Sequence, residues 1–317
     1  MASDPPTRPT LATISTVTPV ERPARLWPGI ALATGGSIAF SGKAIIVKLA
    51  YRHGVDAVTL IMYRMLFALP LFVGLAWWAG RGRPALTARD WRVVAGLGFS
   101  GYYLASFLDF AGLAYVSAGF ERLVLYLNPT LVLLLGRVLF QRRVARRQLV
   151  ALAVSYAGVL LVFGHEMHLA GSHVALGAAL VFASAVSYAV YLVFSGEEVK
   201  RLGSLRLTGL ATTVACLLCI AQFLLTRPLG AARVETPVLW LSLLNAGACT
   251  FLPVLLVMMA MERVGATVAA QTGMIGPLST ILMGIVILGE PFTPWIAAGT
   301  AFVLTGIWML ARARPAT

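Results

Sequence analysis

Long apolar stretches alternate with short polar segments along most of the chain. Ten of these stretches have close to the roughly 20 residues that an α-helix needs to cross the hydrocarbon core of a bilayer. They cover residues 28–49, 57–79, 92–114, 117–140, 147–164, 174–195, 207–226, 238–260, 266–288 and 294–311. This pattern predicts an all-α membrane protein with ten transmembrane helices.

The two halves of the chain repeat one plan at a fixed spacing. Pro129 and Pro277 lie 148 residues apart, and so do Gly158 and Gly306. A spacing that is kept along the chain indicates a duplicated unit. We therefore expect a disordered cytoplasmic tail and two repeats of five helices each, which cover residues 1–26, 27–165 and 174–312.

Five helices per repeat is an odd number, so the second copy must enter the membrane in the opposite orientation. The prediction is a pair of inverted five-helix repeats. Inverted repeats are typical of secondary transporters, whose substrate site lies near the bilayer midplane where the repeats meet.

Composition and charge agree with a membrane protein. Hydrophobic residues make up 59% of the chain and charged residues 12%, against about 25% charged residues in soluble proteins. The net charge of +13 comes from arginines and lysines between the apolar stretches. If the N-terminus is cytoplasmic, 17 of them lie inside and 3 outside. The positive-inside rule therefore predicts an inner-membrane protein with both termini in the cytoplasm, and these charges need no nucleic acid to explain them.

Four charged residues lie within the predicted helices of the first repeat: Lys43, Arg64, Asp109 and Glu121. All four fall about 6–11 Å below the outer surface. Each charge costs about 2.5–3.5 kcal/mol at a helix centre, so these residues must be paired or face water. One interpretation is an ion-pair lattice that holds the helices together. The other is that Lys43 and Arg64 bind a substrate carboxylate while Asp109 or Glu121 takes up a proton or acts as a gate.

Two further cations, Lys48 and Arg122, lie slightly nearer the outer surface. We expect these long side chains to reach the interface by snorkelling.

The second repeat carries neutral polar and aromatic side chains instead of charges. Tyr188, Tyr191, Asn245 and Gln271 are suited to stacking on, and hydrogen bonding to, an amphipathic solute. They are our further candidates for substrate binding. For the tyrosines, ordinary interior packing is an equal alternative.

Two prolines interrupt the fourth and ninth apolar stretches. Pro129 and Pro277 each lack an amide donor, which frees the carbonyl four residues earlier, at Leu125 and Gly273. Such bends at membrane depth are tolerated where they are packed or line a cavity. We interpret them as paired pivots, with a fixed kink as the alternative.

Two segments carry a resemblance to a known family. They are AGLAYVSAGFERLVLYLNPTLVLLLGRVLF from residue 111 and AMERVGATVAAQTGMIGPLSTILMGIVILGEP from residue 260. Over about residues 28–312, the chain resembles the EamA family of the drug/metabolite transporter superfamily. Its ILGEP run contains Glu290, whereas the first copy departs from the motif with Arg142. The resemblance implies ten helices, a central cavity and export of amino acids or related metabolites without ATP.

No nucleotide-binding motif is present in the sequence, so a gradient or an exchange must drive transport. The expected function is export of small metabolites, such as amino acids or related amphipathic solutes, by alternating access. An importer of a small metabolite or of a nucleobase- or vitamin-like solute is the first alternative. A remote alternative is an intramembrane serine protease, because Gly98-Phe99-Ser100-Gly101 matches the GxSG pattern of such enzymes. We expect a small-molecule substrate, the lipid bilayer as surroundings, no cofactor, no metal, and a monomer or weak dimer.

Overall fold

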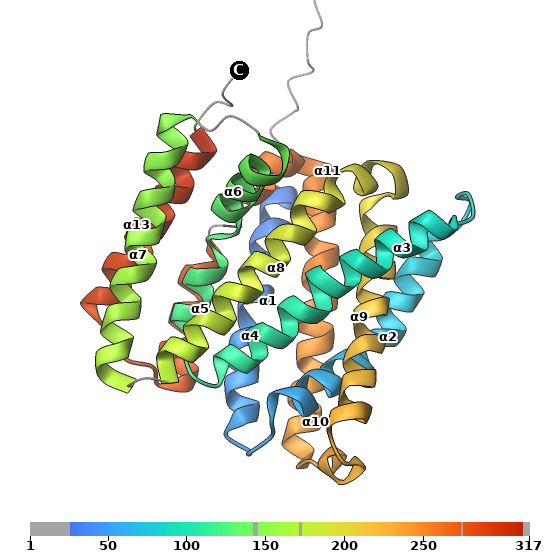
Figure 1. Ribbon diagram of the computed structural model, residues 1–317, viewed down its shortest axis with the longest axis horizontal. Coiled ribbons are helices and arrows are strands. Elements are labelled where there is room, and N and C mark those ends of the chain that lie inside the picture. Colours follow the sequence, from blue (N-terminus) through green and yellow to red (C-terminus); the bar gives the residue numbers. More distant parts are fainter. Residues whose placement is uncertain (1–25, 142–144, 171–172, 274, 313–317) are drawn as a thin grey trace, which may run out of the picture.

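The computed structural model describes residues 26–141, 145–170, 173–273 and 275–312, and the regular elements in these ranges are helices (Figure 1). The predicted tail lies outside this part except for Leu26, which begins the first helix. The helices are α1 (Leu26–Tyr51), α2 (Ala57–Gly80), α3 (Ala88–Leu97), η2 (Gly98–Leu104), α4 (Ala105–Leu113), α5 (Ala118–Leu125), α6 (Asn128–Phe140), α7 (Arg146–Ala170), α8 (His173–Leu202), α9 (Ser204–Thr226), η3 (Leu229–Ala232), α10 (Thr236–Ala246), η4 (Gly247–Phe251), α11 (Leu252–Thr272), α12 (Ile275–Met283), η5 (Gly284–Leu288) and α13 (Pro294–Arg312).

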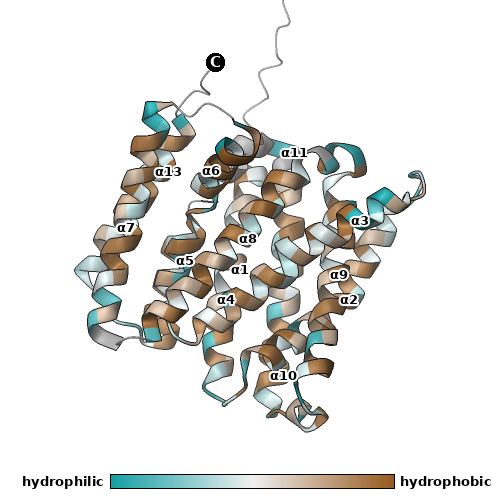
Figure 2. Cartoon of the chain, in the orientation of Figure 1, coloured by the Kyte–Doolittle hydropathy of each residue, from teal (hydrophilic) through white to brown (hydrophobic). Residues whose placement is uncertain are grey.

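Within the described ranges, nine helical segments are long and apolar enough to cross a membrane, and the apolar helix Ile275–Leu288 is shorter. Figure 2 shows hydrophobic residues along most of the helix lengths and hydrophilic residues gathered near the helix ends. An all-helical membrane protein is therefore confirmed.

The predicted start of the ninth stretch, at residue 266, is wrong. Helix α11 continues to Thr272, and the next helix begins only at Ile275. The polar residues near Arg263 suggested a loop, but no proline interrupts the segment from Leu252 to Thr272 beyond its first turn. The helix therefore propagates until Gly273.

The helices pack as two bundles that each mix elements from both halves of the chain. In the first bundle, α1 packs against α10, η4, α11 and α12; in the second, α8 packs against η2, α4, α5 and α6. Two further pairs, α2 with α9 and α7 with α13, lie beside these bundles (Figure 1). When the halves are exchanged, the main contacts of α1 map onto those of α8.

The two ends of the molecule differ in charge. The C-terminal ends of α2, α6 and α8 lie at one end of the molecule, which we call the basic end (Figure 1). The described arginines and lysines here include Arg81, Arg83, Arg89, Arg92, Arg146, Arg147, Lys200, Arg201, Arg206 and Arg312. The connections after α1 and α9 lie at the opposite end (Figure 1) and carry Arg52, Arg227 and Arg233.

Wide π-helical turns occur at matching places in the two halves. The segments η2 and η4 follow α3 and α10, and each begins at a glycine, Gly98 or Gly247. Such turns are frequent at functional sites because they displace side chains from the regular helical positions. In η4, the turn contains Thr250, which contacts the buried Arg64.

Candidate functional site

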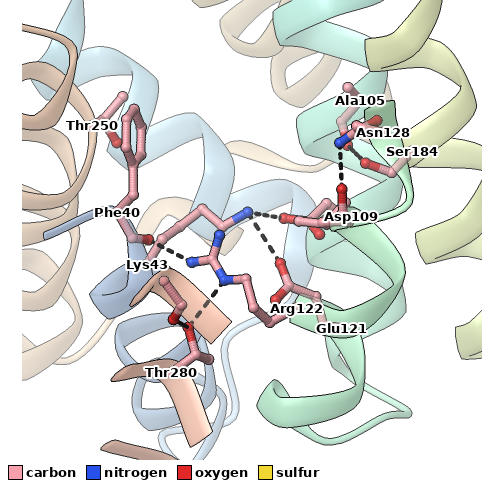
Figure 3. Close-up of polar contacts among 12 residues, drawn as sticks. Phe40, Lys43, Ala105, Asp109, Glu121, Arg122, Asn128, Ser184, Thr250 and Thr280 are labelled. Atoms are coloured by element: carbon pink, nitrogen blue, oxygen red, sulfur yellow. Dashed lines mark hydrogen bonds and ion pairs between the residues drawn. The ribbon is translucent and has the colours of Figure 1, made fainter. Parts of the chain in front are cut away.

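Three of the predicted charged residues meet at the interface between the bundles (Figure 3). Lys43 on α1 forms an ion pair with Asp109 on α4 and another with Glu121 on α5, in which Lys43 Nζ lies 3.2 Å from Glu121 Oε1. Glu121 is fully buried and Asp109 is almost so. One ammonium group therefore holds two carboxylates. These contacts connect α1 of the first bundle to α4 and α5 of the second.

The pairing leaves hydrogen-bonding capacity unused. Asp109 Oδ1 and Glu121 Oε2 have no hydrogen-bond partner among the described residues. The contact between Lys43 and Glu121 is an ion pair that lacks hydrogen-bond geometry. Buried polar atoms are normally satisfied, so these free oxygens mark a place where a proton or a ligand can bind.

The helix that carries Glu121 is held at its N-terminus by side chains from other elements. Ser117 caps α5 by accepting a hydrogen bond from the Phe120 amide at 3.1 Å. The Ser117 hydroxyl donates to Glu166 on α7, and Glu290 accepts the Ala118 amide at 2.9 Å. The N-terminal amides of a helix carry partial positive charge, so both carboxylates stabilise this position. The position of Glu121 therefore depends on residues from both halves.

Arg64 does not join the two carboxylates directly. Its Nε donates to Thr250 Oγ1 at 3.1 Å, and its guanidinium lies 5.1 Å from the centre of the Phe110 ring. Arg64 Nη1 is buried without a hydrogen-bond partner among the described residues. Thr250 in turn donates to the carbonyl of Asn245, whose side-chain oxygen is also buried and unpaired in this part of the chain. Thr250 thus links Arg64 to the backbone of Asn245.

The expectation that Arg122 snorkels to the interface is wrong. Its Nε donates to Thr280 Oγ1 at 3.0 Å, and its Nη2 donates to the Phe40 carbonyl at 2.8 Å (Figure 3). Both acceptors belong to the first bundle. Because these neutral acceptors are close, the guanidinium is satisfied inside the protein and crosses the same interface as Lys43.

The candidate tyrosines lie in a separate aromatic cluster. Tyr191 packs edge-to-face on Tyr102 with their hydroxyl oxygens 3.1 Å apart, and it stacks on Tyr188 at 5.5 Å between ring centroids. Among the described residues, these ring and hydroxyl contacts do not include Lys43 or its carboxylates.

Both proline breaks are present, and side chains satisfy the carbonyls that the prolines leave free. Helix α5 ends at Leu125, whose carbonyl accepts a hydrogen bond from Asn128 Nδ2 at 2.7 Å. At the second break, the Gly273 carbonyl accepts a hydrogen bond from the Tyr126 hydroxyl at 2.6 Å. The first break is thus tied to the second across the bundle interface. The pivot role of Pro129 and Pro277 stays a prediction.

Sequence reasoning missed the partners that complete the site: Phe40, Phe110, Tyr126, Thr250 and Thr280. The free carbonyl expected at Gly273 indicated that a hydrogen-bond donor lies near it, but not that this donor is Tyr126. Two predicted positions lie outside the described part: Arg142 entirely, and Gln271 by its side chain.

Ser100 has a packing contact rather than a catalytic one. Its carbonyl accepts a hydrogen bond from Ser187 Oγ at 2.7 Å. The described ring and polar contacts of His53, His165 and His173 are with Glu235, Trp295 and Tyr115, all away from Ser100. No described contact therefore supplies Ser100 with a histidine base.

The fold and the site together define a class: a polytopic helical membrane protein whose two bundles meet across buried ion pairs. Comparison with known proteins gives the family. The EamA-like transporter family model matches residues 27–164 and 175–312. The chain belongs to this family of transporters. Membership indicates transport rather than catalysis as the activity.

Individual relatives agree with the family assignment. The chain is 31% identical over 291 residues to the uncharacterized transporter YcbK of Bacillus subtilis (strain 168), covering 86% of this chain and 90% of YcbK. A protein of known crystal structure shares the fold with a TM-score of 0.60 at 17% identity, over 89% of this chain and 95% of that protein.

Proposed function

We propose that this transporter is a secondary exporter of small metabolites, such as amino acids or related amphipathic solutes, which works by alternating access. The observation that carries the proposal is the buried group of Lys43, Asp109 and Glu121 between the two bundles. Intramembrane charges are costly and typically mark substrate or proton pathways. A group that ties two movable bundles together is suited to be made and broken during a transport cycle.

The proposed architecture is ten transmembrane helices in two inverted repeats. The protein lies in the inner membrane, and both termini are in the cytoplasm. Two observations support it. The contacts of α1 and of α8 correspond when the halves are exchanged, and the basic residues gather at one end. The short helix Ile275–Leu288 serves as the ninth crossing. We expect the protein to act as a monomer or weak dimer.

In the proposed cycle, a substrate carboxylate binds at Arg64 and Lys43, while Asp109 or Glu121 takes up a proton. Arg64 has no ion-pair partner among the described residues, so its charge and its unused Nη1 donor are free to bind an anion. Asn245 adds a buried amide beside it, and Tyr188, Tyr191 and Gln271 belong to a later stage of the path. A ligand that competes for one member of the group shifts the balance between the two bundle arrangements.

A resistance screen tests the function and identifies the solute. Cells that overproduce the protein are challenged with toxic levels of single amino acids and their analogues, and the protecting solute is then followed in proteoliposomes. We expect efflux that Lys43→Met and Arg64→Met each reduce at least about tenfold, the effect of losing one charged contact. The matched control is Arg233→Met, which removes an exposed cation at the end of the molecule opposite the basic end. This variant should transport normally.

The same assay separates the alternatives. Accumulation instead of efflux would favour the importer. Unchanged flux in both variants would leave the buried charges with a packing role only. Dependence of the flux on an imposed pH gradient, lost in Glu121→Gln, would support proton coupling.

A further inference from the structure

A pocket of about 360 Å³ lies where the end of α1 meets the segment after η5, at the end of the molecule opposite the basic end. Lys48, Tyr51, Arg52, Leu288 and Glu290 line it. Its size is at the lower end of the range of about 300–1,000 Å³ for small-molecule sites. Neither the buried charged group nor the proposed cycle uses this pocket.

The lining of this pocket carries two cations and one carboxylate. Arg52 donates a hydrogen bond at 2.7 Å to the Leu288 carbonyl, which is a neutral acceptor. Within the described ranges, neither Lys48 nor Arg52 forms an ion pair. The one carboxylate in the lining, Glu290, already accepts the Ala118 amide. The carboxylates of Glu290 and Glu166 act on Lys48 only from beyond ion-pair distance. Among the described residues, both cations of the lining therefore lack a direct ionic contact.

We propose that this pocket is a binding site for the carboxylate of a small solute, held between Lys48 and Arg52. A guanidinium presents paired donors that match a carboxylate, and an ammonium adds a second charged contact. The Tyr51 hydroxyl donates to the Phe110 carbonyl, so its ring and Leu288 provide an apolar wall for the rest of the ligand.

This site is distinct from the buried group that includes Lys43. Lys48 lies five positions after Lys43, which is about 7.5 Å along the helix axis. Lys43 forms direct ion pairs with two carboxylates, whereas Glu290 and Glu166 act on Lys48 only from beyond ion-pair distance. The proposal goes beyond the proposed function, because binding here can be measured whether or not the protein moves a solute.

Two substitutions should have effects of opposite sign. Lys48→Met removes an attractive charge and should raise the half-saturating carboxylate concentration about tenfold or more. Glu290→Gln removes a repulsive charge but keeps an oxygen that accepts the Ala118 amide, so it should lower that concentration severalfold. If these residues had only a structural role, both substitutions would weaken the protein and neither would strengthen binding.

The test uses the full-length protein in phosphatidylcholine nanodiscs, with thermal unfolding followed as sodium benzoate replaces sodium chloride at constant ionic strength. Binding to the folded state raises the Tm as the ligand concentration rises. We expect a saturable increase with benzoate and none with benzamide, its neutral counterpart. Arg233→Met, a cation at the same end but outside the pocket, should respond like the wild type.

Three results would overturn the proposal: an equal response to benzamide, an unaltered benzoate response in Lys48→Met, or weaker binding in Glu290→Gln. A further result, from phosphatidylglycerol nanodiscs, would also overturn it. If the benzoate response disappears only there, a lipid phosphate occupies the pocket, and the assignment to a solute carboxylate is wrong.

Discussion

The buried charges show how single residues depend on their neighbours in this protein. Lys43 holds Asp109 and Glu121, both of which are almost completely buried. Breaking a buried ion pair by removing one partner costs about 3–5 kcal/mol, because a charge is left uncompensated. Replacing every member by a neutral residue of similar shape is often close to neutral. Stability measurements can therefore separate charge compensation from packing.

We predict that Lys43→Met lowers the Tm of the purified protein strongly. The triple variant Lys43→Met, Asp109→Asn, Glu121→Gln should recover most of that loss, because no unpaired charge is left. Thermal unfolding in one detergent, at one pH, gives the comparison. A triple variant as unstable as Lys43→Met alone would contradict the charge argument and point to lost packing.

Asp56 illustrates a carboxylate whose role depends on pH. It caps α2 by accepting hydrogen bonds from the Val58 amide at 3.0 Å and the Thr59 hydroxyl at 2.6 Å, and it pairs with Arg227 at 3.1 Å. Partial burial acts to raise the pKa of Asp56, but the hydrogen bonds from Thr59 and the charge of Arg227 outweigh it and hold the pKa below its usual value. The ionised form is therefore the one that the fold favours.

Because the pKa of Asp56 is lower in the folded protein than in the unfolded chain, ionised Asp56 stabilises the fold at pH values above the unfolded pKa, near 3.9. This stabilisation is lost as the pH falls through the pKa of the folded protein. We predict that Asp56→Ala destabilises the protein by about 0.5–2 kcal/mol at pH 7, the usual cost of a lost helix cap. The gap in Tm between wild type and variant should narrow from pH 5 down to pH 3. A gap that stays constant over this range would exclude ionisation as its source.

At the scale of elements, glycines decide how closely α7 and α13 approach. A Cβ on Gly158 would lie 2.6 Å from the Gly299 carbonyl oxygen, and one on Gly306 would lie 2.6 Å from the Ala151 carbonyl oxygen. These obstacles are backbone atoms, which cannot move aside without separating the helices. Small residues at such positions allow the close contact on which helix association in membranes depends.

Two glycines on α7 provide a matched test. A Cβ on Gly164 would meet no atom within 4 Å. Gly164→Ala should therefore be neutral or stabilise the protein by up to about 1 kcal/mol through helix propensity, whereas Gly158→Ala should lower the Tm clearly. Thermal unfolding of the two variants side by side gives the answer. Equal effects would mean that α7 and α13 are not held by this contact.

At the scale of the whole molecule, each bundle contains helices from both halves of the chain. Lys43 and Thr280 belong to one bundle, and their partners Glu121 and Arg122 belong to the other. These two polar contacts therefore cross the interface between the bundles, while the pairs α2 with α9 and α7 with α13 lie beside it. Movement of one bundle against the other would break these contacts together.

The proposed orientation predicts the side from which each end can be labelled. The native cysteines Cys216, Cys219 and Cys249 are buried, so the background should be low. A cysteine at the exposed Gly230 should react with a membrane-impermeant maleimide in intact cells. One at the exposed Arg89, at the basic end, should react only after permeabilisation. The reverse result would contradict cytoplasmic termini.

The class of the protein could be read from the sequence because it depends on local properties. Apolar length determines whether a segment crosses a membrane, and nine of the predicted crossings have described helices of sufficient length. Pro129 and Pro277 predicted two helix breaks, because a proline removes a hydrogen bond from the helix in which it lies. The boundary after α11 was placed wrongly, because polar residues near Arg263 do not by themselves end a helix.

What the sequence determined by itself is therefore a duplicated, all-helical membrane protein with four charged residues inside the apolar stretches of its first half. Only the tertiary structure decided which charges meet. It joined Lys43 to two carboxylates, turned Arg64 to Thr250 and Arg122 to Phe40, and put Tyr188 and Tyr191 in a different cluster. Pairing depends on the rotation and approach of helices far apart in the chain, and the depth of a residue in one helix specifies neither.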